Sequence, residues 1–158
     1  YIVLQKNWTM EMLGVAFIFQ GVFSLIGLSI GGPVIDKFDT KKTSLFALAP
    51  LFLGIVALIT LDNNILIFVY MSLLGLTLGI TPPFIGSLWA EIYGLESLGT
   101  VKALLHACSV FASALAPVVF GYMIDFGLGI FTISIMSLAI IIFSTLLPVV
   151  TMHIHEKK

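Results

Sequence analysis

Polar side chains that could bind a solute are rare in this sequence, and the first group lies on one short stripe. Gln20, Ser24, Gly27 and Gly31 recur at i, i+4, i+7 and i+11, which places them on one face of a helix. The Gln20 amide both donates and accepts hydrogen bonds, and its small neighbours leave room for a ligand. Polar side chains cost free energy when they face hydrocarbon, so they are expected to have a role. We interpret Gln20 and Ser24 as candidate solute contacts.

A second stripe follows in the C-terminal third of the chain. His106, Ser109 and Ser113 share a helical face, and Pro117 lies just beyond, where its missing N–H frees a backbone carbonyl. Because histidine titrates near neutral pH, His106 is a candidate proton carrier as well as a solute contact. A structural interpretation stays open, since membrane-helix serines often bond to the carbonyl four residues earlier.

The elements that carry these stripes must cross a membrane. The chain is 59% hydrophobic and 9% charged, whereas a soluble domain carries about 25% charged residues. Period-two alternation is absent, which excludes a barrel, and the apolar stretches approach the ~20 residues that a spanning helix needs. We therefore predict an all-α membrane protein, a five-helix transmembrane bundle. Its spans cover about 10–32, 43–61, 65–89, 100–124 and 129–150.

The flanks of this bundle, which extends over 10–152, are predicted from charge and polarity. Residues 1–9 read as an outer loop and the end of a preceding helix, and 153–158 as a cytoplasmic tail. Six of the seven basic residues fall on one side, so the positive-inside rule puts that side and the C-terminus in the cytoplasm. A net charge of -1 leaves no basic face for nucleic acid.

Several kinds of chemistry are missing from the spans. No Asp, Glu, Lys or Arg lies deep inside any stretch, so a carboxylate solute would need a cationic partner elsewhere. His153 and His155 have no third partner, so we predict no metal site, and no nucleophile stands beside a base. We expect neither catalytic residues nor a cofactor.

Glycine and proline mark a turn, a seam and candidate hinges. In "GGPVIDKFDTKK", Gly32 would let a neighbouring helix approach, and Pro33 is expected to end regular hydrogen bonding. Asp36 could then accept hydrogen bonds from the N-terminus of another helix. Pro82 and Pro83 are expected to bend or interrupt their helix, and with Pro117 they are candidate hinges. A seam of small residues in the same span consists of Ser72, Gly75, Gly79 and Gly86.

Two segments resemble the major facilitator superfamily (MFS). "GGPVIDKFDTKK" is similar to the signature that these transporters place after helices two and eight, although Asp39 and Thr40 replace a usual glycine and basic residue. "WAEIYGLESLGTVKALLHACSVFASALAPVVFGYMID" resembles the passage between the tenth and eleventh helices of bacterial members. Because the chain also lacks an initial Met, we expect a fragment, helices eight to twelve of a twelve-helix fold.

The resemblance implies a secondary active transporter, a permease that moves a small organic solute by alternating access. A carboxylate is among the solutes considered, and symport or antiport with a proton or another coupling ion stays open. The implied partners are the lipid bilayer and the missing N-terminal half, in a bacterial-type plasma membrane. A cytoplasmic gating turn would comprise Gly32, Asp36, Lys37, Lys41 and Lys42. The alternative is an independent five-helix membrane protein with a scaffold or assembly role.

Overall fold

Helices make up almost all of the regular structure. The computed structural model describes residues 6, 8–37, 47–60 and 63–155, among which there is no β-strand. These residues form four helices, namely α2 (Met10–Lys37), α4 (Ala49–Thr60), α5 (Leu66–Asp125) and α6 (Ile130–His155). The prediction of an all-α membrane protein is confirmed.

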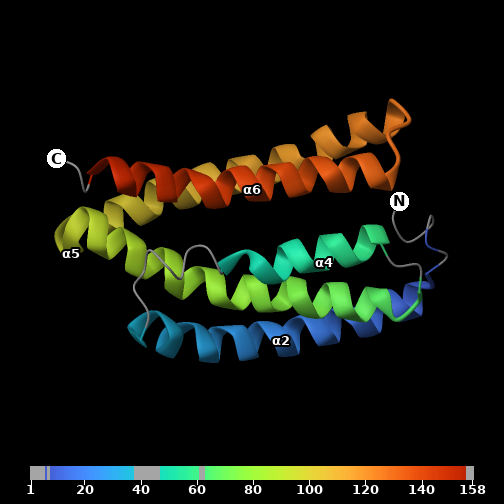
Figure 1. Ribbon diagram of the computed structural model, residues 1–158, viewed down its shortest axis with the longest axis horizontal. Coiled ribbons are helices and arrows are strands. Elements are labelled where there is room, and N and C mark those ends of the chain that lie inside the picture. Colours follow the sequence, from blue (N-terminus) through green and yellow to red (C-terminus); the bar gives the residue numbers. More distant parts are fainter. Residues whose placement is uncertain (1–5, 7, 38–46, 61–62, 156–158) are drawn as a thin grey trace.

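The longest helix, α5, is two helices joined across a kink at Gly94. We call residues 66–93 its first limb and residues 95–125 its second limb. With the two limbs counted separately, five helical rods run alternately in opposite directions (Figure 1). This alternation is what five crossings of a bilayer require.

Within the described ranges, three helical segments are long and apolar enough to cross a membrane. They are Met10–Val34, Leu66–Ala90 and Glu96–Asp125, and they overlap the first, third and fourth predicted spans. Two further apolar helices, Ala49–Thr60 and Phe131–Thr145, are shorter and fall within the second and fifth. The start of the second predicted span, 43–46, lies outside the described residues.

Local hydrogen bonds set the ends of the helices. The Thr9 hydroxyl accepts a hydrogen bond from the Met12 N–H at 3.2 Å and caps the start of α2. The Asn63 side-chain oxygen accepts one from the Ile65 N–H at 3.1 Å just before α5. After α5, the N–H of Leu128 donates to the Met123 carbonyl, a bond that closes the turn towards α6.

The first limb of α5 is the central rod of the three-helix layer that it forms with α2 and α4. Figure 1 shows it between these two helices, and its most extensive contacts are with them. At one end of the layer, Trp8, Leu58 and Ile67 belong to a buried cluster that joins all three elements. Phe84 of the first limb packs with Ala47 in a second cluster, near the start of α4.

Glycines bring α2 and the first limb into backbone contact. A Cβ added at Gly27 would lie 2.6 Å from the carbonyl oxygen of Leu76, and one added at Gly31 would lie 3.1 Å from the Pro83 ring. At Gly75 and Gly79 it would collide with the carbonyl oxygens of Gln20 and Ser24. Two members of the predicted small-residue seam, Gly75 and Gly79, therefore pack on α2, whereas Gly86 faces Lys102 of the second limb.

The bend in α5 lies at Gly94 rather than at the prolines. The backbone stays helical through Pro82, Pro83 and Pro117, and Gly94, with φ 73° and ψ 170°, is the position where it is not. This region is essentially restricted to glycine. Of the expectation that Pro82 and Pro83 bend or interrupt their helix, the interruption is wrong, because the helix continues through both prolines and the break in helical dihedral angles falls at Gly94.

Pro33 likewise does not end α2, which continues to Lys37. A proline within a helix removes one backbone hydrogen bond and crowds the carbonyl four residues earlier, yet α2 stays helical past Pro33. The expectation that Pro33 stops the first span is therefore corrected: the helix carries on by one more turn into the charged segment.

The second limb of α5 differs from the first in its exposure. In the most apolar 18-residue window of Glu96–Asp125, no residue is buried. In the corresponding window of Leu66–Ala90, 28% of the residues are buried. Large apolar side chains such as Phe111, 68% exposed, project from it. Lys102 near its start reaches back to the first limb, where its Nζ lies 3.5 Å from the position of a Cβ on Gly86.

Candidate functional site

The first polar stripe, Gln20, Ser24, Gly27 and Gly31, lies on α2. One part of it packs against another helix, and the other part is accessible. Gly27 and Gly31 are buried against the first limb, so this part of the stripe is a packing seam. Gln20 and Ser24 are half-buried, and their backbone carbonyls face Gly75 and Gly79. Of this stripe, Gln20 and Ser24 therefore keep accessible side chains, and the two glycines do not.

The second stripe is fully accessible. His106, Ser109 and Ser113 are all exposed on the second limb. The Ser109 hydroxyl donates to the His106 carbonyl and the Ser113 hydroxyl to the Ser109 carbonyl, each at 2.8 Å. Each hydroxyl proton is thus bound by its own helix, while the oxygen lone pairs stay free to accept a bond from a ligand.

The structure does not bring the two stripes together. In Figure 1, α2 and the second limb lie on opposite sides of the layer formed by α4 and the first limb. Gln20 and His106 therefore do not form one pocket within the described chain. Any solute held by both stripes would have to be enclosed by additional protein.

The candidate gating turn is described only in part. Lys37 is exposed at the end of α2, and a Cβ added at Gly32 would meet nothing within 4 Å. The backbone of Asp36 is helical. Lys41 and Lys42 lie outside the described residues, so the gating role of the turn stays a prediction.

The candidate hinge prolines lie within continuous helix, as described above, and their role in motion is also untested. As for metal ligands, no group of three or more His, Cys, Asp or Glu residues that could hold an ion occurs in the described parts of the chain. Cys108 is exposed on the second limb beside the His106 stripe.

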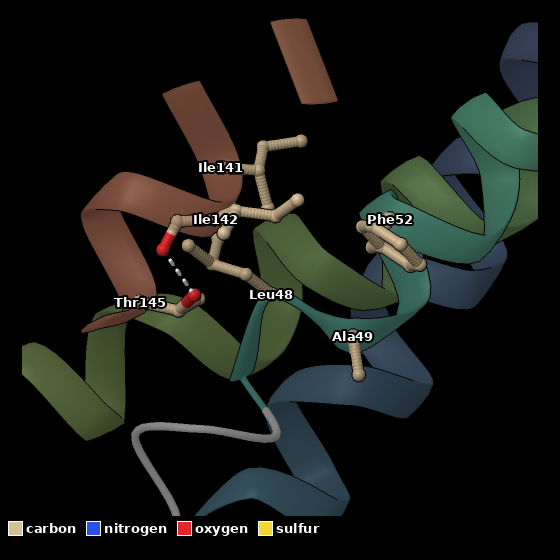
Figure 2. Close-up of a pocket in the computed structure, with 6 residues that line it drawn as sticks. All are labelled: Leu48, Ala49, Phe52, Ile141, Ile142 and Thr145. Atoms are coloured by element: carbon tan, nitrogen blue, oxygen red, sulfur yellow. Dashed lines mark hydrogen bonds between the residues drawn. The ribbon is translucent and has the colours of Figure 1, made fainter. Parts of the chain in front are cut away.

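One hollow was not foreseen from the sequence. A groove of about 250 Å³ lies between the start of α4 and the middle of α6 (Figure 2). It is lined by Leu48, Ala49, Phe52, Ile141, Ile142 and Thr145. The sequence gives no signal for it, because both segments read as uniformly apolar supports.

Alternating apolar rods, small-residue helix contacts and sparse polar groups on the spans define a multi-pass integral membrane protein without enzyme-like machinery in its described part. A family model described as Major Facilitator Superfamily matches residues 1–158. The chain therefore belongs to this superfamily, whose members are transporters and not enzymes, which confirms the resemblance and the expectation of no enzymatic activity. No curated protein and no solved structure matches the chain.

Proposed function

We propose that this chain is helices eight to twelve of an MFS transporter and lines one side of its solute pathway. In this assignment α2 is helix eight, α4 is helix nine, the limbs of α5 are helices ten and eleven, and α6 is helix twelve. The five alternating rods support it, as do the two segments with family resemblance.

The observation that carries this proposal is the uncovered polar face of the second limb. A span with His106, Ser109 and Ser113 on one face would be poorly suited to lipid, because polar groups in hydrocarbon are costly. Nothing in the described chain covers this face. The N-terminal half of the transporter would complete the site, with the solute near the midplane between the halves.

The proposed solute is a small organic molecule bound mainly through hydrogen bonds on this side. Gln20 offers an amide, and the serines offer acceptor lone pairs. A carboxylate solute would take its cationic partner from the N-terminal half, since the spans described here place no Lys or Arg at mid-depth. His106 would be the proton carrier in a symport or antiport cycle.

The gating turn and the sidedness complete the proposal. Asp36 would accept hydrogen bonds from a helix N-terminus of the other half, and Lys37, Lys41 and Lys42 would anchor the turn at the cytoplasmic surface. The C-terminus would then also be cytoplasmic.

Uptake by the full-length protein carrying Gln20→Leu tests the solute contact. We expect the apparent affinity to fall by roughly 5- to 150-fold, which corresponds to about 1–3 kcal/mol for an unpaired ligand group. Ser29→Ala is the matched control, because the Ser29 side chain is exposed and its hydroxyl donates to the Leu25 carbonyl of its own helix. If Gln20 merely bridges helices, its replacement would lower the melting temperature and leave the affinity unchanged.

A further inference from the structure

Lys102 extends the second polar stripe towards the kink of α5. Residues that are four, seven or eleven positions apart lie within about 60° of one another around a helix. Lys102 precedes the three residues of the stripe by these intervals, and all four side chains are exposed, namely Lys102, His106, Ser109 and Ser113. The face that we propose as the lining of the solute pathway therefore carries a positive charge at one end.

The Lys102 ammonium is held back over the first limb of α5. Its Nζ lies 3.5 Å from the position of a Cβ on Gly86, so the missing side chain of Gly86 leaves space beside it. Gly86 lies about 5 Å along the helix axis beyond Pro83, whose ring contacts Gly31 at the end of the first stripe. The charge thus stands at the depth where the first stripe ends.

This position distinguishes Lys102 from a lysine that only anchors a helix to lipid headgroups. Such a lysine extends its ammonium away from the bundle into the headgroup layer, whereas Lys102 turns towards the other limb. Of the carboxylates whose side chains the structure describes, none pairs with Lys102; these are Glu11, Glu96 and Asp125. The described part of the chain therefore leaves the charge of Lys102 unneutralised.

An ammonium at this position selects solutes by charge. It attracts an anion and repels a cation, and its field is screened less beside hydrocarbon than in open water. Along the helix axis, Lys102 lies about 6 Å from His106 and about 10 Å from Ser109. A solute that approaches from the kink end meets the charge before it meets the hydrogen-bonding groups.

We propose that Lys102 is the entry site for a small organic anion at the cytoplasmic end of the solute pathway. This proposal rests on the proposed function, in which the polar face of the second limb lines the pathway and the kink is cytoplasmic. Lys102 recruits the carboxylate of the solute, which then passes to the groups around His106 and Ser109. A second cation, supplied at mid-depth by the N-terminal half, is compatible with this role.

Charged thiol reagents measure the field of Lys102 without requiring the solute. In inverted vesicles containing the full-length protein with Cys108→Ser and Ser109→Cys, sulfonatoethyl methanethiosulfonate, an anion, is compared with its trimethylammonium counterpart. Lys102→Gln should lower the ratio of the anionic to the cationic reaction rate by about fourfold or more, because one charge about 10 Å away changes the two rates in opposite directions. High salt should diminish this difference.

Lys102→Arg is the matched control, since it keeps the charge and should keep the ratio. Lys102→Met replaces Lys102→Gln if the glutamine lowers the melting temperature. An unchanged ratio in the neutral variants, with both reagents still reacting, would overturn the proposal and leave the pathway intact, as expected of a headgroup anchor. A Ser109→Cys that reacts with neither reagent would contradict the pathway itself, and this proposal with it.

Protection of the same cysteine tests the class of solute. We expect at least one of acetate, lactate, succinate and citrate to slow its reaction with a neutral maleimide. In Lys102→Gln, about fivefold more of that acid or a still higher concentration should be needed, because the charge that attracts the acid is gone. Equal protection by acetate and its neutral counterpart acetamide would overturn the anion preference, as would the absence of protection by all four acids.

Discussion

Gly75 of α5 lies directly against the backbone of Gln20 on α2. A Cβ at Gly75 would collide with the Gln20 carbonyl oxygen and lie 3.0 Å from its Cα, so no larger residue fits without moving one helix. The residue with the best hydrogen-bonding side chain in the candidate site is therefore held by a helix contact directly behind it. Packing and the proposed solute contact are linked at this position.

Gly75→Ala should destabilise the protein by about 1–3 kcal/mol, because the added methyl overpacks a backbone contact. Gly21→Ala is the matched control, since a Cβ there meets nothing within 4 Å. Thermal or denaturant unfolding in detergent measures the difference. Equal stability of the two variants would contradict the close approach of α2 and α5.

Gly94→Ala should also destabilise, here by backbone strain of about 1–3 kcal/mol. Gly94 has φ 73° and ψ 170°, where side chains with a Cβ are rarely found. Gly99→Ala, in regular helix with open space around it, should be tolerated. A Gly94→Ala variant as stable as the wild type would show that the two limbs of α5 are not joined by this kink.

The arrangement of helix ends predicts the membrane topology. In Figure 1 the ends of α2 and α6 lie on the same side as the kink of α5, and the turns before α5 and α6 lie on the other. In a Cys108→Ser background, Thr100→Cys should react with an impermeant thiol reagent from the cytoplasm and Asn63→Cys from outside. Labelling of both from one side would refute the topology.

His106 is expected to couple transport to protons. In full-length protein reconstituted into vesicles, His106→Gln should abolish accumulation driven by a pH gradient while solute exchange at equal pH continues. Ser97→Ala, which removes an exposed hydroxyl bonded to the Tyr93 carbonyl, is the control and should accumulate solute normally. Undiminished accumulation by His106→Gln would exclude a proton-carrying role.

Much of the architecture was predictable because apolar length and spacing determine spans directly. The seam containing Gly75 and Gly79 was readable from its spacing, but its partner was not, since several helices could have packed on it. The kink at Gly94 depends on the backbone dihedral angles of this one residue. It could not be predicted, because the residues on either side favour helix. At Pro33 and Pro82 the local rule predicted an end or a bend, yet the helical backbone continues past both prolines.

The candidate site was less predictable than the fold. Periodicity placed Gln20 and Gly27 on one face, but only the packing shows that Gly27 is buried and Gln20 is half-accessible. The groove beside Phe52 depends on how far α4 and α6 stand apart, and no residue pattern encodes that separation.

Aqueous accessibility of Ser109 tests the proposed solute pathway most directly. In the full-length protein with Cys108→Ser, Ser109→Cys should react with a water-soluble maleimide although it lies near mid-span, and solute should slow the reaction. Phe111→Cys, about 200° around the helix, should face lipid and react at least tenfold more slowly. A Ser109→Cys variant that reacts no faster than Phe111→Cys, or that solute leaves unprotected, would contradict a solute pathway along this face.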